Sequence, residues 1–364
     1  MRKLQVGCLS LILCGESFLL AQTSATSSPV VERSATPSSA TSPAPSRAHN
    51  RISLDVLVTD KAGKAVSDLE PFDFSILDNN QPRKVLGFRR TDGKVGNKID
   101  QPVELIIVVD AVNMAYQGVT LMRLEVEKFL RRDGGHLVQP TSVFVFSSEG
   151  MRIQPQPSQD GNALAAMLDQ STGTVRAVST AAGVYGQGEQ FTKSTQTLMT
   201  LADNEARKPG RKILVWIGSG WPLLQGRQFL QTNEGKERHF ASIVEMSRKL
   251  REARITMCGI FTLYAAGTNT FYQGFLKGVK TSKQADAGNL AMQVLATQTG
   301  GRVLGPSNDV DGLIARCVGD VGEYYTLVFE PPPAVEANEY HDLKIQVNHA
   351  AVDVRTSSGY YNQP

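Results

Sequence analysis

Asp110 is the residue whose type and position are best suited to binding chemistry. It ends the apolar run 103–110, whose length and β-branched content predict a strand buried on both faces of a parallel sheet. Open α/β sheets bind ligands in the crevice outside the carboxyl ends of their strands, which is where this carboxylate would lie. Because hard divalent cations prefer oxygen ligands, Asp110 and the nearby amide of Asn113 are the candidate metal ligands.

The elements that must position Asp110 alternate between strands and helices along the middle of the chain. Strands are predicted at 103–110, 142–146, 212–217, 255–261 and 301–304, and helices at 162–170, 189–207, 238–251, 289–299 and 311–318, with a further helical face at Met122, Val126, Phe129 and Leu130. This alternation predicts an α/β domain at 102–319, a doubly wound and mostly parallel sheet with helices on both faces. The glycine-rich stretch 183–188 lacks the Lys-Ser/Thr of a phosphate-binding loop and is expected to form a loop at the rim.

Two shorter segments with strand patterns, 51–92 and 320–364, flank this region. The first has predicted strands at 52–58, 72–77 and 84–88, and the second at 324–329, 343–347 and 352–355. A unit of three strands is only marginally stable alone. We therefore expect the N- and C-terminal strands to pair into one small β-sandwich.

The beginning of the chain indicates export. Arg2 and Lys3 precede a mostly apolar stretch at 4–20, which predicts a signal peptide at 1–21, with an uncleaved anchor as the alternative. Residues 22–50 are rich in Ser, Thr, Ala and Pro and predict a disordered linker. Because no later segment is long and apolar enough to span a membrane, we expect no transmembrane segment after signal removal and a secreted or periplasmic location. The net charge of +3 over 364 residues gives no electrostatic case for nucleic acid as a partner.

Cys258 and Cys317 are the two cysteines that lie beyond the predicted signal peptide. One falls in a strand pattern and the other in a helical pattern. Backbones in neighbouring α/β layers are usually about 10 Å apart, which exceeds the limit of about 7 Å between the Cα atoms of a disulfide. We therefore expect two buried free thiols.

Both terminal segments carry motifs that resemble an exported bacterial family called VWFA-related proteins. The N-terminal motif is matched by Asp60, Gly63, Val66, Leu69, Phe72, Phe74, Asp78 and Val85, and the C-terminal motif by Tyr324, Tyr325, Leu327, Phe329, Val354, Arg355, Gly359, Tyr360 and Tyr361. The resemblance covers nearly all of the chain beyond the signal peptide. It implies that 102–319 is a von Willebrand factor type A (vWA) domain.

The vWA resemblance also implies a particular metal site, the metal-ion-dependent adhesion site. In that family the first strand ends in Asp-x-Ser-x-Ser, and a Thr from a second loop and an Asp from a third loop complete the ligand set. Here Val112 and Met114 occupy the serine positions, and the third loop, 218–220, contains no carboxylate. The second-loop candidates are Thr174, Ser179 and Thr180. We therefore expect a degenerate site and no cofactor, with Mg, Ca or Mn as the alternative.

The resemblance implies a non-enzymatic module that mediates protein–protein or surface interaction. Its partner would be an unknown protein or envelope component, contacted by loops that contain Asn113, Ser219, Trp221 and Tyr264. The alternative is a hydrolase or other enzyme on a doubly wound scaffold. Binding is favoured because Ser219 lies outside a Gly-x-Ser-x-Gly nucleophile elbow and the five histidines form no recognisable catalytic motif.

Overall fold

The computed structural model describes residues 51–91, 103–151, 156–170, 183–221, 232–261 and 271–364. The expected signal peptide and linker, the three second-loop candidates and Tyr264 all lie outside these ranges. Within them, no helix combines the length and the apolar character that a membrane span needs.

The core of the α/β part is a sheet of mostly parallel strands. Its members are β5 (Glu104–Asp110), β6 (His136–Ser147), β7 (Gly150–Met151), β8 (Ser158–Asp160), β9 (Lys212–Gly218), β10 (Ile255–Phe261) and β11 (Arg302–Leu304). The strand order is β11-β10-β9-β5-β6-β7, and β8 also pairs with β6. All pairs from β11 to β6 are parallel, whereas β7 and β8 run antiparallel to β6. In chain order this is the 3-2-1-4-5-6 arrangement of doubly wound folds, which changes direction between β5 and β9.

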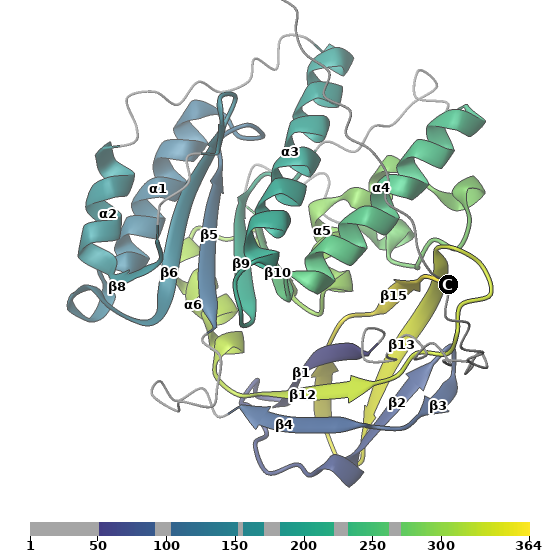
Figure 1. Ribbon diagram of the computed structural model, residues 1–364. Helices are drawn as coiled ribbons and strands as arrows, with labels where there is room; N and C mark the ends of the chain where they lie inside the picture. The colour runs from purple at the N-terminus through teal and green to yellow at the C-terminus, as the bar shows by residue number, and fades with distance from the viewer. Residues whose placement is uncertain (1–50, 92–102, 152–155, 171–182, 222–231, 262–270) are drawn as a thin grey trace, which may run out of the picture. The chain divides into compact units, whose positions relative to one another are not determined.

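Three helices cover each face of this sheet (Figure 1). One face carries α1 (Tyr116–Leu130), α2 (Gly161–Gln170) and α6 (Val310–Val318), and the other carries α3 (Gly183–Ala206), α4 (Asn233–Glu252) and α5 (Met292–Gln298). Alternation along each strand explains the two layers. Leu105, Ile107 and Val109 pack with α1, α2 and α6, while Ile106 and Val108 pack with α3, α4 and α5. The predicted α/β class with helices on both faces is confirmed.

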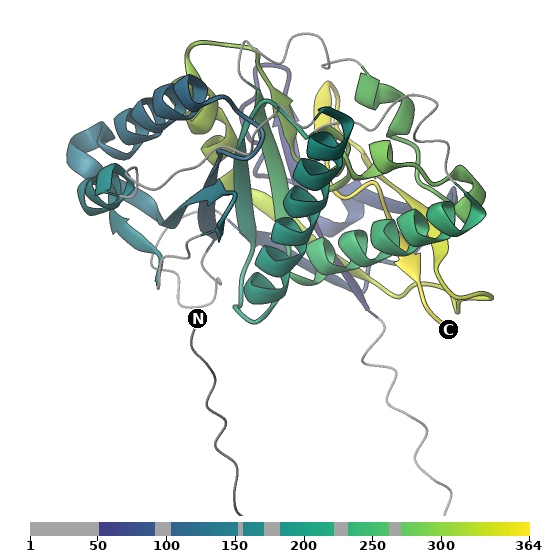
Figure 2. The same cartoon turned by 90° about the horizontal axis from the view of Figure 1, so that it is seen from above.

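The two ends of the chain build a pair of four-stranded sheets. One has the order β14-β1-β12-β4 and the other β15-β13-β2-β3. Their bounds are β1 (Ile52–Asp60), β2 (Phe74–Asp78), β3 (Gln81–Arg83), β4 (Gly87–Thr91), β12 (Tyr324–Phe329), β13 (Glu339–Val347), β14 (Val352–Arg355) and β15 (Gly359–Asn362). N-terminal β1 pairs with C-terminal β12 and β14, and N-terminal β2 pairs with C-terminal β13, all antiparallel. The predicted pairing of the two terminal segments is therefore present, and Figure 2 shows the same strands from above.

A shared apolar core joins the two terminal sheets into a sandwich. Leu54 and Val56 of β1 and Leu327 of β12 pack with Ile76 of β2 and Ile345 of β13. These side chains come from alternate positions of each strand, as expected for sheets that bury one face. Neither terminal segment could form this core without the other.

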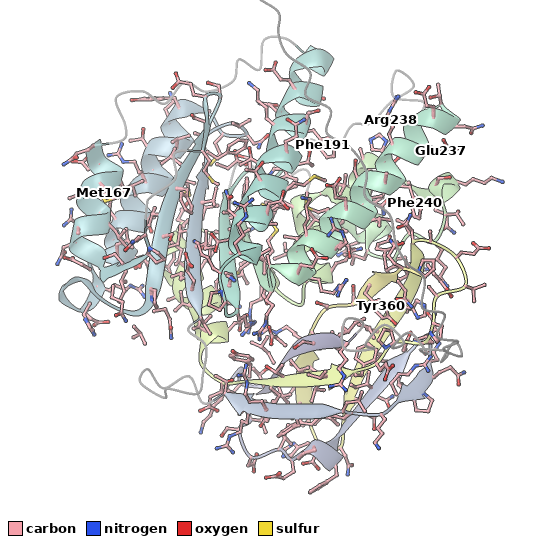
Figure 3. The ribbon with its side chains drawn as sticks, viewed as in Figure 1. Met167, Phe191, Glu237, Arg238, Phe240 and Tyr360 are labelled. Carbon is pink, nitrogen blue, oxygen red and sulfur yellow. A yellow bond between two sulfur atoms is a disulfide. The ribbon has the colours of Figure 1, made fainter. Side chains whose placement is uncertain are left out.

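Ion pairs connect the sandwich to the α/β part. Arg254, just after α4, donates two hydrogen bonds to the carboxylate of Asp55 on β1, at 2.6 and 3.2 Å. Asp320 accepts from both Arg302 and Arg355, at 2.6–3.0 Å. Burial opposes ionisation of Asp320, but the hydrogen bonds from the two arginines outweigh this effect and lower the pKa of the carboxyl. Phe240 of α4, labelled in Figure 3, packs edge to face on Tyr361 of β15, with ring centroids 6.0 Å apart.

Several element boundaries differ from the sequence prediction. The stretch 183–188 is not a rim loop, because α3 begins at Gly183 and includes all of it. Favourable contacts of the rest of α3 with the sheet outweigh the low helix propensity of glycine. The predicted helix at 289–299 is divided into a 3-10 turn, η10 (Ala287–Leu290), and α5. Further 3-10 turns are η2 (Pro71–Asp73), η3 (Arg132–Gly135), η8 (Phe271–Phe275), η9 (Ser282–Gln284) and η11 (Gly319–Val321).

The prediction of two free thiols was wrong. Cys258 on β10 and Cys317 on α6 form a disulfide, and their Cα atoms are 6.2 Å apart. The spacing of about 10 Å that we used refers to the axis of a helix above a sheet. The Cα atoms on the facing side of the helix lie about 2.3 Å nearer, and small side chains such as Cys let the two layers approach further.

Candidate functional site

The carboxylate of Asp110 lies at the carboxyl end of β5, next to the point where the strand order changes direction. Its side chain is completely buried. Gly218, at the end of the neighbouring strand β9, leaves room for it, because a Cβ at this position would stand 3.0 Å from the Cβ of Asp110. The sequence prediction placed Asp110 at the ligand crevice of the sheet, and the structure places it at this edge.

Four hydrogen bonds converge on Asp110. Its Oδ1 accepts from the backbone N–H of Val112 at 3.1 Å and from that of Asn113 at 3.0 Å. Its Oδ2 accepts from Nδ2 of Asn113 at 2.7 Å and from the indole Nε1 of Trp216 at 2.9 Å. An ionised carboxylate offers about four acceptor sites, so these donors occupy all of them.

All four donors are neutral, which determines the electrostatics of the site. Burial raises the pKa of Asp110, and the hydrogen bonds from Asn113, Trp216 and Val112 oppose this without reversing it. To coordinate a divalent ion, Asp110 would have to release at least one of these bonds. Val112 and Met114, at the two serine positions of the adhesion-site motif, are buried apolar side chains. As arranged, these residues fit a hydrogen-bonded carboxylate and do not fit a divalent cation.

Asn113 connects Asp110 to helix α3. Besides its bond to Asp110, Nδ2 of Asn113 donates to the hydroxyl of Ser194 at 2.9 Å, and that hydroxyl donates to the backbone oxygen of Gln190 at 2.7 Å. Nε2 of Gln190 in turn donates to the backbone oxygen of Val112 at 2.9 Å. Asn113 therefore acts as a donor to Asp110 and a link to α3, which differs from the predicted role of a second metal ligand. Its Oδ1 is buried and has no hydrogen-bond partner among the described residues.

Aromatic rings cover the other side of the carboxylate. Trp216 of β9 packs edge to face on Phe146 and Trp221, with centroid distances of 5.7 and 5.3 Å. Trp221 was predicted to face a partner, but it is only 4% exposed and packs in the core instead. Gly220 has a positive φ of 83°, and a Cβ there would stand 2.9 Å from the ring of Phe261, so this turn requires glycine.

The remaining candidate residues are less informative. Ser219 is half-buried in the turn after β9, and Tyr264 lies outside the described residues. A buried carboxylate–histidine pair does exist, because Asp78 Oδ1 lies 2.6 Å from Nδ1 of His341. This pair belongs to the sandwich, where the hydroxyl of Tyr360 also donates to Asp78 at 3.0 Å. It therefore cannot serve as a base for Ser219.

Sequence reasoning missed the residues that complete the site from other elements. Trp216 lay inside a run that was interpreted only as a buried strand. Gln190 and Ser194 are polar residues four positions apart, so they lie on the same face of a helix, next to the inward-facing Phe191 and Leu198. This spacing was the available signal that the helix makes polar contacts with the sheet side of the domain.

No family model and no curated protein matches the sequence. Among solved structures, the pilus adhesin SpaC from Lactobacillus rhamnosus GG is similar with a TM-score of 0.35 and 9% sequence identity. The match covers 82% of this chain and 50% of that one, so the chain spans about half the length of SpaC.

Proposed function

We propose that the chain is an exported binding module of the vWA type, which engages a protein or surface component of the cell envelope through the carboxyl edge of its sheet. Its adhesion site is degenerate and works without a metal ion. The observation that carries this proposal is the hydrogen bonding of Asp110. Asp110 stands where the resembled family has its metal-binding aspartate, and its carboxylate accepts four hydrogen bonds from neutral protein donors.

The strand order supports the vWA assignment together with the sequence motifs. Asp110 lies where the order changes direction between β5 and β9, which is the general ligand position of doubly wound sheets. The half-buried Ser219 and the start of α1 lie at the same edge of the sheet. Loops at such an edge can vary in sequence while the sheet keeps them in place.

The disulfide supports export. Bridges form and persist in oxidising compartments and are rare in the cytosol of most organisms. The Cys258–Cys317 bridge is therefore consistent with the predicted signal peptide and with a secreted or periplasmic location.

The enzymatic alternative has weaker support. A hydrolase would need a nucleophile within hydrogen-bond reach of a base. In the described part of the chain, the buried His341 has its Nδ1 paired with Asp78, and its Nε2 lies 3.6 Å from the carboxylate of Glu339. This histidine therefore contacts two acids and no hydroxyl nucleophile at that nitrogen.

A capture experiment with two matched variants tests the proposal. Tyr116 is 63% exposed at the start of α1, beside the loop that follows Asp110, and Val138 is 59% exposed near the amino end of β6. The full chain would be immobilised and the component captured from envelope extract would be quantified, in Mg²⁺ and in EDTA. We expect Tyr116→Arg to weaken capture several-fold because it places charge in the contact area.

The control, Val138→Arg, should leave capture unchanged because it lies at the opposite end of the sheet. EDTA should also have no effect. Equal loss with both variants would place the contact elsewhere, and loss in EDTA would show that a metal takes part.

A further inference from the structure

A cleft of about 830 Å³ lies between strand β13 and the segment that begins at the end of η8. Residues 274–280 form one wall, and Tyr340, Asp342 and Ser358 form the other. Clefts that bind small ligands and peptide side chains have volumes of about 300–1,000 Å³. The cleft is thus large enough to be a binding site, and neither Asp110 nor its hydrogen-bond partners line it.

The walls of this cleft are held in place by close packing. Gly278 and Gly359 both approach Tyr340 closely. A Cβ on Gly278 would stand 1.9 Å from Cζ of Tyr340, and a Cβ on Gly359 would stand 2.2 Å from its hydroxyl oxygen. Asn289 Nδ2 donates to the backbone oxygen of Phe275 at 3.2 Å. Because these contacts fix the tyrosine and the opposite wall, little ordering would be needed when a ligand binds.

Charge at the cleft is predominantly positive. Lys277 and Lys280 are exposed on one wall, and neither forms an ion pair with a carboxylate of the described residues. Asp342, on the other wall, is the opposing charge. Burial raises the pKa of the Tyr340 hydroxyl to about 12, so this group stays protonated and can donate to an anion.

We propose that this cleft binds an acidic peptide segment of a partner protein, whose carboxylates pair with Lys277 and Lys280. The chemistry is complementary, since a neutral hydroxyl and two ammonium groups that have no carboxylate partner among the described residues are all donors to carboxylate oxygens. A nucleic acid fits less well, because two lysines cannot neutralise a run of phosphates and the chain as a whole carries only +3. An acidic-peptide site rests on the proposed function as a binding module, but its residues differ from those at the Asp110 edge of the sheet.

Fluorescence anisotropy of the full chain with labelled peptides tests this proposal. A hexaglutamate peptide should bind, and binding should weaken as salt increases, whereas hexalysine and a single-stranded oligonucleotide should not bind. The variant Lys277→Gln/Lys280→Gln should weaken hexaglutamate binding about tenfold, since two charge-assisted contacts are lost. Asp342→Asn should strengthen it, because a repelling charge is removed.

The matched control is Lys64→Gln/Lys84→Gln, which removes the same charge from two exposed lysines of the sandwich that do not line the cleft. It should change the dissociation constant less than twofold. Absence of hexaglutamate binding, equal weakening by both double variants, or preferential binding of the oligonucleotide would each overturn the proposal. Capture through the Tyr116 surface could still succeed in all three cases, so failure here is distinguishable from failure of the proposed function.

Discussion

Replacing Asp110 by Asn should destabilise the fold, although the two side chains have nearly the same shape. Only one terminal atom of Asn can accept a hydrogen bond. In one orientation of the amide, the backbone N–H groups of Val112 and Asn113 lose their acceptor. In the other orientation, Nδ2 of Asn113 and Nε1 of Trp216 lose theirs. Whichever way the amide turns, two N–H groups therefore lose this acceptor: one is fully buried, and the other belongs to the part-buried Asn113, whose Nδ2 keeps its bond to Ser194.

The expected magnitude follows from these two lost partners. A buried polar group without a hydrogen bond costs about 1–3 kcal/mol, so two cost about 2–6 kcal/mol. Removing a buried charge offsets part of this cost, and we expect a net loss of about 2–4 kcal/mol in the free energy of unfolding. Urea unfolding of the full chain, followed by tryptophan fluorescence, would measure it.

Asp60→Asn is the matched control for this substitution. In the turn after β1, a single oxygen of Asp60 accepts both local bonds, from the N–H groups of Ala62 and Lys64 at 2.9 Å each. An Asn carbonyl can accept both, so this variant should stay within about 0.5 kcal/mol of the wild type. If Asp110→Asn proves as stable as Asp60→Asn, the reasoning about a saturated carboxylate is refuted.

Three further outcomes are expected. Millimolar Mg²⁺, Ca²⁺ or Mn²⁺ should leave the melting temperature unchanged. An ion that binds the folded chain would add about 2.7 kcal/mol to the free energy of unfolding at a concentration a hundredfold above its dissociation constant. A rise of several degrees in the melting temperature that is lost in Asp110→Ala would therefore contradict this prediction. Reduction of the Cys258–Cys317 bridge, which spans 59 residues, should lower the free energy of unfolding by about 4 kcal/mol. Thiol titration of the denatured, unreduced Cys8→Ser/Cys14→Ser chain should find no free thiol, and a result of two free thiols would disprove the bridge. Because the pKa of Tyr340 is raised to about 12, its contribution to stability is complete below about pH 10 and is lost as the pH rises towards about 12. The free energy of unfolding of the wild type relative to Tyr340→Phe should therefore fall by about 3 kcal/mol over that interval. A constant difference between the two proteins would be evidence against a buried, protonated tyrosine.

The fold was predictable wherever a local pattern determines it. The run 103–110 is apolar on both faces, and β5 occupies Glu104–Asp110. Strands β10 and β12 have the predicted bounds, because short buried strands between turn residues leave few alternatives. Pairing of the two chain ends was also predictable, since neither had enough strands to bury its own core.

What the sequence did not predict depends on how closely layers pack in three dimensions. The distance of 6.2 Å between the Cα atoms of Cys258 and Cys317 follows from the close approach of α6 to β10. The inclusion of 183–188 in α3 runs against the local glycine content and is supported by the packing of the rest of that helix. Neither outcome is visible in a window of neighbouring residues.

The candidate site also has a part that was predictable from neighbouring residues and a part that was not. Asp110 was identified because its position depends on the end of one strand, and its bonds to Val112 and Asn113 span two and three residues. The bond from Trp216 spans 106 residues and the contact of Asn113 with Ser194 spans 81. These long-range donors distinguish a hydrogen-bonded carboxylate from a metal ligand, because they fill the acceptor sites that an ion would need. Asp110 is therefore a buried carboxylate whose acceptor sites are filled by neutral donors of Val112, Asn113 and Trp216, and only the first two of these residues lie near it in the sequence.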